Sequence, residues 1–146
     1  MGTKVREVMS GRPRVASPET PVRQIAELMA SEDVGAIPIL EGEQLAGMIT
    51  DRDIVVRAIA KGKNPEGMAV REILSRDVVT VEPDQDLSDV LEIMAQYQVR
   101  RVPVVDEDKR LVGVVSQADV ALEAKEKAVG ETVAEISKPA EGPRHA

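Results

Sequence analysis

Residues 47–53 read GMITDRD and residues 113–119 read GVVSQAD, so the pattern Gly-x-x-[Ser/Thr]-x-x-Asp occurs twice, 66 positions apart. In both places an apolar run leads into the pattern and a helix-like run follows it, which predicts a strand-to-helix turn. Upstream, residues 5–10 (VREVMS) return as residues 70–75 (VREILS), 65 positions later. The chain therefore contains an internal duplication, and we expect two copies related by a pseudo-twofold axis.

Each copy has the same order of sequence patterns. A short opening helix comes first, with Thr3 as the N-cap of residues 4–9 in the first copy. An extended piece follows, and then an amphipathic helix with apolar residues at i, i+3, i+4 and i+7, for which Pro21 is expected as the first helical residue behind Thr20. Two apolar runs around a polar turn predict a β-hairpin, and a helix ends the copy. The predicted ranges are 14–16 and 78–81 for the extended pieces, 36–40 with 45–49 and 101–105 with 111–115 for the hairpins, and starts near Asp51 and Gln117 for the last helices.

These patterns predict an α/β chain of the α+β kind, in which each repeat holds a short β-sheet flanked by helices. We expect the first repeat at residues 3–61, a linker at 62–69 and the second repeat at 70–128. Residues 129–146 are expected to form a short helix and a flexible tail. Residues 54–60 (IVVRAIA) are apolar nearly all round, which indicates a helix with more than one apolar neighbour, either the other copy or another chain.

The composition excludes several classes of function. A net charge of −7 over 146 residues argues against binding to a phosphate backbone, and Tyr97 as the sole aromatic residue leaves no stacking platform for nucleic acid. Cys is absent and the one histidine is His145, so we expect no catalytic residues, no metal site and no enzyme. Neither a membrane-spanning run nor a signal peptide is present, so the expected location is the cytoplasm, without a membrane partner.

The repeated pattern itself points to anion binding. A strand-to-helix turn exposes unpaired backbone N–H groups, and the hydroxyl of Thr50 or Ser116 can donate to a phosphate oxygen there. A carboxylate one turn later, Asp53 or Asp119, can accept hydrogen bonds from both hydroxyls of a ribose. The glycine before the turn allows a ligand to approach the backbone closely.

A purely structural interpretation competes with this one. Ser/Thr-x-x-Asp is close to a capping box, in which the two side chains satisfy the N–H groups at the start of their own helix. Because a duplication copies a cap as readily as a binding site, the recurrence of the pattern does not decide between them.

The duplicated motifs resemble a tandem pair of cystathionine β-synthase (CBS) domains, known as a Bateman module. The resemblance rests on the opening Val-Arg-Glu-[Val/Ile], the Pro-x-x-x-[Val/Leu] entry to the next helix, Val-x-x-[Ile/Val]-Pro-[Ile/Val] and the Gly-x-x-[Ser/Thr]-x-x-Asp turn, and it covers residues 3–128. The chain is most similar to small stand-alone bacterial CBS pairs, including the hypoxic-response type. The repeats at 3–61 and 70–128 are thereby identified as CBS domains.

The resemblance implies binding without chemistry. Such modules place AMP, ADP, ATP or S-adenosylmethionine in two clefts between the repeats, and no cofactor is required. Carried onto this chain, Asp53 and Asp119 would hold ribose hydroxyls, and Thr50 and Ser116 would approach the first phosphate. The base would lie among side chains near Val15, Ile37, Thr80 and Val102.

The two clefts are expected to be unequal. The second copy has Arg100 and Arg101 before its hairpin, where the first copy has Gly35 and Ala36. Related modules often grip phosphates with basic residues at this place, and arginine makes charge-assisted bonds to phosphate oxygens. The alternative is ordinary ion pairing with surface carboxylates such as Asp106 or Glu107.

The sequence thus predicts a regulatory module that senses an adenosine nucleotide and signals to an unknown protein partner. The alternative is a dimeric scaffold that binds no nucleotide. In both cases we expect a homodimer built on the helices around residues 22–31, 54–60, 87–97 and 118–128.

Overall fold

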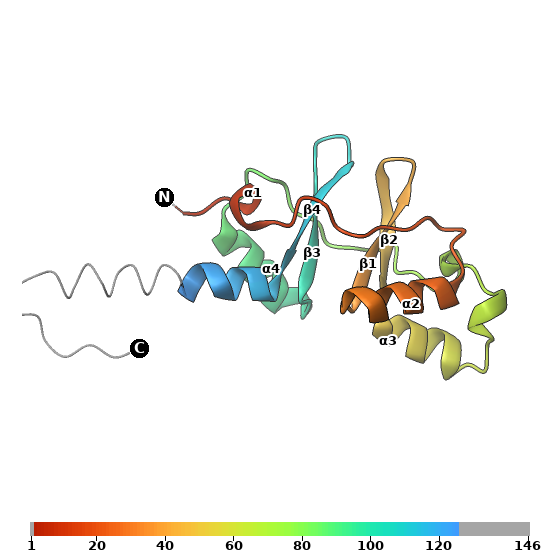
Figure 1. Ribbon diagram of the computed structural model, residues 1–146. Coiled ribbons are helices and arrows are strands. Elements are labelled where there is room, and N and C mark those ends of the chain that lie inside the picture. The colour runs from red at the N-terminus through yellow and green to blue at the C-terminus, as the bar shows by residue number, and fades with distance from the viewer. Residues whose placement is uncertain (1, 126–146) are drawn as a thin grey trace, which may run out of the picture.

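The computed structural model describes residues 2–125, which form two halves lying side by side, each with one β-hairpin and its own helices (Figure 1). In the first half β1 (Ala36–Glu41) pairs antiparallel with β2 (Gln44–Thr50), and in the second half β3 (Arg101–Val105) pairs with β4 (Leu111–Ser116). Both hairpins and the α+β class were predicted, and both are confirmed. The predicted helix and tail at 129–146 lie outside the described residues.

Each hairpin gains a third strand only as a single parallel bridge. Ala16 bridges Ile39 in the first half, and Val81 bridges Val104 in the second. The predicted extended pieces at 14–16 and 78–81 therefore extend each sheet by one residue. The hairpin turns contain a residue with positive φ, Gly42 at 66° and Lys109 at 64°.

The amphipathic helices are α2 (Val22–Glu32) and α4 (Leu87–Tyr97), and the apolar spacing in their sequences predicts which of their residues are buried. They bury equivalent residues against the sheets: Val22, Ile25 and Met29 in α2, and Leu87, Val90 and Met94 in α4. The expected start of α2 is wrong by one residue, because Pro21 has extended backbone angles and is the N-cap rather than the first helical residue.

The opening helix of the first copy, α1 (Val5–Val8), begins behind Lys4 rather than Thr3. The Thr3 hydroxyl donates instead to Glu123 Oε1 at 3.1 Å, so Thr3 is not the predicted N-cap. The equivalent segment of the second copy is a short 3-10 turn, η3 (Val70–Glu72), which follows another such turn, η2 (Pro65–Gly67), in the predicted linker.

The closing helices begin where the sequence predicts. In the first half α3 (Asp51–Asp53) continues as a π-helical stretch, η1 (Ile54–Ile59), and in the second half residues 117–125 are α-helical. Within residues 2–125 no helix is both long and apolar enough to cross a membrane.

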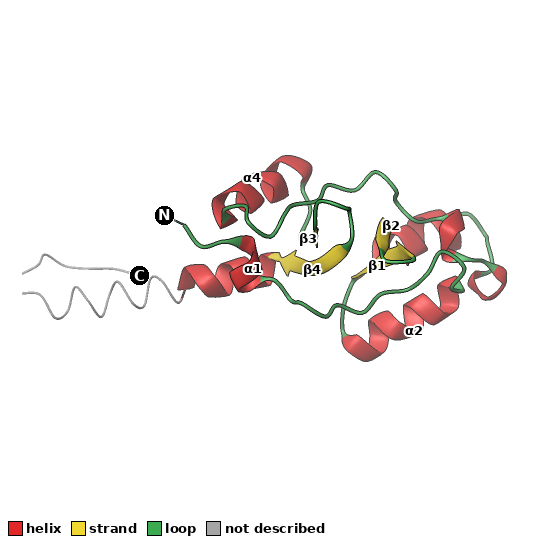
Figure 2. Ribbon diagram, turned by 90° about the horizontal axis from the view of Figure 1, so that it is seen from above, coloured by secondary structure: helices red, strands yellow, loops and turns green. Residues whose placement is uncertain are grey.

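The opening segment of each copy packs on the other copy. Val5 belongs to the core around β3 and β4, whereas Val70 and Ile73 belong to the core around β1 and β2. The exchange is reciprocal: Val5 N donates to Gln85 O, and the equivalent Val70 N donates to Thr20 O. A pseudo-twofold relation requires such paired bonds. Figure 2 shows the N-terminal segment running from α1 to the other half.

Ion pairs hold the exchanged segments in place. Arg6 pairs with Asp84, and its counterpart Arg71 pairs with Glu19. The hydrogen bond that Arg71 donates to Glu19, and the negative charge of that carboxylate, raise the pKa of Arg71 above the ordinary value. Lys4 Nζ donates a hydrogen bond to Asp86 Oδ1 at 2.8 Å, and this bond lowers the pKa of the Asp86 carboxyl.

Candidate functional site

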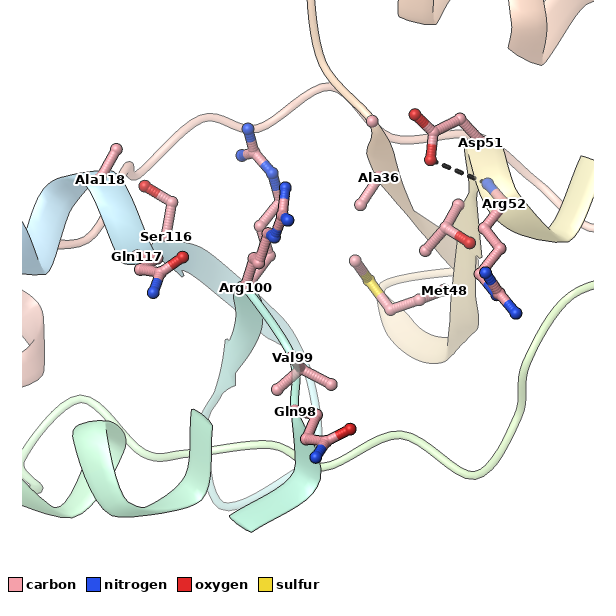
Figure 3. A pocket seen from close by; sticks show the side chains of 13 residues that line it. Ala36, Met48, Asp51, Arg52, Gln98, Val99, Arg100, Ser116, Gln117 and Ala118 are labelled. Carbon is pink, nitrogen blue, oxygen red and sulfur yellow. Dashed lines mark hydrogen bonds between the residues drawn. The ribbon is translucent and has the colours of Figure 1, made fainter. Parts of the chain in front are cut away.

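A cleft of about 750 Å³ lies between the two halves, where the strands meet the closing helices (Figure 3). Its volume is in the range that small-molecule sites occupy. Both halves contribute: Gly35, Ala36, Met48, Thr50, Asp51 and Arg52 from the first, and Gln98, Val99, Arg100, Arg101, Ser116, Gln117 and Ala118 from the second. Thr50 and Ser116, 66 positions apart in sequence, therefore line one continuous cavity.

Each repeated turn forms a capping box. In the first half Asp53 N donates to Thr50 Oγ1 at 3.1 Å, and Thr50 N donates to Asp53 Oδ2 at 3.0 Å. The bonds of Asp119 and Ser116 in the second half have the same lengths. The capping interpretation is thus confirmed as geometry, but each box uses only one carboxylate oxygen, Oδ2. Asp53 and Asp119 themselves are not among the residues that line the cleft.

The two glycines of the pattern have a packing role in addition to the ligand approach expected of them. A Cβ on Gly47 would lie 2.3 Å from Leu74 Cδ1 and 2.4 Å from Ser75 O, and a Cβ on Gly113 would lie 2.8 Å from Ser10 O. These glycines accommodate the exchanged opening segments, which bridge β2 through Met48 and Ser75 and β4 through Val114 and Ser10. The chain fills the positions that a Cβ would take, while the Gly47 backbone also lines the cavity of about 370 Å³ that Thr80 lines, so the approach of a ligand there stays a prediction.

The arginine pair is part of the cleft. Arg100 and Arg101 stand at the start of β3, where Gln117 N donates to Arg100 O at 2.7 Å, and in Figure 3 the Arg100 side chain extends into the space between the halves. Within residues 2–125 neither guanidinium is in an ion pair, and the alternative partner Asp106 accepts hydrogen bonds from the backbone N–H of Asp108 and Arg110. Both cations are therefore available to an anion.

Sequence reasoning missed a third cation of the cleft, Arg52. It lies inside the repeated pattern, one residue before Asp53, where the second copy has Ala118. A comparison of the pattern's variable positions between the two copies is the signal that would have found it.

The residues expected near the base are not gathered at the cleft. The side chains of Ile37 and Val102 are 0% exposed and belong to the two cores. Val15 lines a groove of about 400 Å³ along α2, and Thr80 lines a third cavity of about 370 Å³ near the hairpin turns. Their contact with a base stays a prediction, as do the ribose and phosphate roles of the other site residues.

The family model described as "CBS domain" matches this chain twice, at residues 5–59 and 70–126. The CBS domain-containing protein YhcV of Bacillus subtilis is 36% identical over 92% of this chain and 96% of its own length. Hypoxic response protein 1 of Mycobacterium tuberculosis is 34% identical over 94% of this chain and 96% of its own length. Both relatives match this chain over nearly their whole length.

Solved structures share the fold. The crystal structure of Hypoxic Response Protein I, with two coordinated zinc ions, superposes with a TM-score of 0.75 at 35% identity, covering 82% of this chain and 97% of that one. The CBS domain pair of protein MJ0100, in complex with 5′-methylthioadenosine and S-adenosyl-L-methionine, superposes with a TM-score of 0.78 at 29% identity. The match covers 87% of this chain and 99% of that one. CBSX2 in complex with AMP superposes with a TM-score of 0.77 at 25% identity, and the match covers 87% of this chain and 99% of that one.

The two zinc ions belong to the hypoxic-response structure. In this chain, residues 2–125 contain no group of three or more His, Cys, Asp or Glu side chains placed to hold a metal ion.

Proposed function

The chain belongs to the CBS domain family, and we propose that it is a regulatory module that binds an adenosine nucleotide in its central cleft. Nucleotide binding would change the relative arrangement of the two halves or their affinity for a protein partner. The location in the cytoplasm stays a prediction of the sequence.

The observation that carries this proposal is the charge of the cleft. The chain is acidic overall, with a net charge of −7, yet three arginines, Arg52, Arg100 and Arg101, line the same cavity against one carboxylate, Asp51. The Ser116 hydroxyl lies on the same wall as the arginine pair. Guanidinium groups and a hydroxyl donor together suit a phosphate, because charge-assisted hydrogen bonds to phosphate oxygens are stronger than neutral ones.

The ligands of similar CBS pairs suggest the adenosine part. AMP in one structure and S-adenosyl-L-methionine in another share the adenosine group and differ in what is attached to it. Because this cleft is cationic on its second-half side, we expect AMP, ADP or ATP rather than S-adenosylmethionine, whose sulfonium is positive.

The proposal includes a homodimer. Apolar side chains are about half exposed on the outer helices: Val55, Val56 and Ile59 on η1, Leu91 and Tyr97 on α4, and Leu122 in the helix at 117–125. Val56 and Leu122 occupy equivalent positions of the two copies, so each half exposes an apolar group at the same place of its closing helix. A second copy of the chain would bury them. Part of the predicted interface, residues 126–128, lies outside the described residues.

A dimeric scaffold without nucleotide is the second candidate. The capping boxes favour it, since Thr50 and Ser116 already have partners in their own helices. In that case the arginines of the cleft would interact with solvent or with a protein partner.

Thermal melting with added AMP, ATP and S-adenosylmethionine separates the two candidates. A ligand that binds only the folded state raises the stability by RT ln(1 + [L]/Kd), about 2.7 kcal/mol at one hundred times Kd. We expect AMP and ATP to raise Tm, and the increase to shrink in Arg101→Ala. Lys63→Ala removes the same charge from the linker and is the matched control. No shift with any of the three ligands would favour the scaffold.

A further inference from the structure

Arg57 and Glu123 occupy equivalent positions of the two copies but carry opposite charges. Each lies one helical turn after the aspartate of the repeated pattern, Asp53 or Asp119. Both side chains also contact an exchanged opening segment: Arg57 Nη1 donates to Ile73 O at 3.1 Å, and Glu123 Oε1 accepts from Thr3 Oγ1 at 3.1 Å. The two halves thus present the same carboxylate in opposite electrostatic surroundings.

In the first half both oxygens of the aspartate have a partner. Asp53 Oδ2 accepts from Thr50 N at 3.0 Å, and Asp53 Oδ1 lies 3.7 Å from Arg57 Nε. The Asp53 side chain is 14% exposed, and the hydrogen bond to Ile73 O holds the guanidinium over it. The Arg57 side chain is 50% exposed and has one hydrogen bond and one ion pair, and a ligand hydroxyl would have to compete with this cation for Asp53.

In the second half one oxygen is left over. Asp119 Oδ2 accepts from Ser116 N at 3.0 Å, and no hydrogen bond or ion pair to Asp119 Oδ1 occurs within residues 2–125. Glu123 replaces the arginine, so no cation is paired with Asp119 in the described part of the chain. The capping role of Asp119 therefore leaves it able to accept from a hydroxyl as well.

We propose that Arg57 is a specificity-determining residue that closes the first half to a nucleoside, so that the chain binds one nucleotide, with its phosphate in the cleft and its ribose diol on Asp119, which lies against the cleft-lining Ser116. This inference rests on the proposed nucleotide binding. It assigns the sugar to the half that also supplies Arg100, Arg101 and Ser116 for the phosphate. The first half, with Gly35 and Ala36 at the places of the two arginines, supplies only Arg52 as a cation and has no open carboxylate of this kind.

Isothermal titration calorimetry with AMP and with 2′,3′-dideoxy-AMP tests the assignment. For the wild-type chain we expect one equivalent of AMP per chain and binding of the dideoxy compound weaker by about tenfold or more, since a hydrogen bond to a charged group is lost. Arg57→Gln keeps a donor for Ile73 O but removes the charge, and it should add a second, weaker equivalent of AMP. Arg57→Lys keeps the charge and should still bind one.

The reciprocal change is made in the second half. Glu123→Arg places a cation beside Asp119 and should weaken AMP by about tenfold or more, whereas Glu123→Gln keeps an acceptor for Thr3 and should bind AMP within a few-fold of wild type. Circular dichroism and urea unfolding of each variant verify that it is folded.

The outcomes separate this inference from the function on which it rests. No AMP binding by the wild-type chain overturns the proposed function and this inference together. Two equal equivalents in the wild type, equal binding of the dideoxy compound, one equivalent in Arg57→Gln at saturating AMP, or full affinity in Glu123→Arg each overturn the inference alone.

Discussion

The two halves share their backbone and differ in the charges they present to the cleft. Both have a capping box at the strand-to-helix turn, a glycine under an exchanged segment and a hairpin with the same register irregularity. At the cleft, Gly35 and Ala36 face Arg100 and Arg101 across the pseudo-twofold relation, and Arg52 corresponds to Ala118. Groups needed for packing are the same in both copies, whereas groups available to a ligand differ.

A difference of this kind is what the proposed single nucleotide site requires of a duplicated chain. A glycine under a crossing chain or a cap at a helix start is required twice, because each half must fold. A cation at the mouth of the cleft stabilises no core, so it can be present in one copy and missing in the other. The predictions below test the shared features and the different ones separately.

The largest effect is expected at the shared glycines. Gly47→Ala would place a methyl group 2.4 Å from Ser75 O, a backbone atom that moves only with the exchanged segment. Overpacking of this kind costs about 1–3 kcal/mol, and we expect a loss near the upper end in urea unfolding. Gly113→Ala should cost less, since the backbone atom that it meets, Ser10 O, is farther away at 2.8 Å and the other close neighbour is the flexible Met9 side chain. Gly11→Ala, with nothing within 4 Å, is the control; equal stability of all three would contradict the packing argument.

A large effect on assembly is expected at the equivalent positions Val56 and Leu122. Burying an aliphatic side chain contributes about 1.5–3 kcal/mol, and a carboxylate there opposes association instead. Val56→Glu and Leu122→Glu should each shift the mass measured by light scattering at micromolar concentration from dimer to monomer. Lys63→Glu in the exposed linker should leave the mass unchanged. A wild-type monomer under these conditions would refute the homodimer.

The arginine pair should favour phosphate over adenosine alone. Removing a charge-assisted bond costs about 1.5–3 kcal/mol, so Arg100→Ala or Arg101→Ala should weaken AMP by about tenfold or more while adenosine changes little. Both arginines line the cleft, so we expect each substitution to have this effect. Calorimetry that finds two sites of equal affinity, with neither variant weakening AMP more than adenosine, would show that the arginines have no part in binding.

The smallest effect distinguishes the cap from the ribose ligand. Asp53→Ala and Asp119→Ala each remove one capping box, and both should lose about 0.5–2 kcal/mol of stability in urea unfolding. Asp119→Ala should also abolish AMP binding, whereas Asp53→Ala should retain it. A destabilised Asp119→Ala variant with unchanged affinity for AMP would refute the ribose role.

Local features were predictable because they depend on neighbours in the chain. The apolar spacing of Val22, Ile25 and Met29 is visible in the sequence, and so is the alternation of turn and apolar runs around Gly42. Helix starts were less accurate: Pro21 and Thr3 are each displaced from the predicted role, because a cap is decided by backbone angles and by which partner the side chain finds. The site was predicted in part, with Thr50, Ser116 and the arginine pair at the cleft and Ile37 and Val102 in the cores.

The sequence by itself determined that the chain is a duplication with two hairpins, two amphipathic helices and two strand-to-helix turns, because periodicity and turn residues act over a few positions. Only the tertiary structure decided that Val5 packs in the second half and Val70 in the first. Both cores are aliphatic, so the pattern of an opening segment shows that it is buried but not on which copy. The same exchange explains Gly47 and Gly113, and the meeting of Thr50, Arg52, Arg101 and Ser116 in one cleft likewise depends on how the halves pack, which no local pattern records.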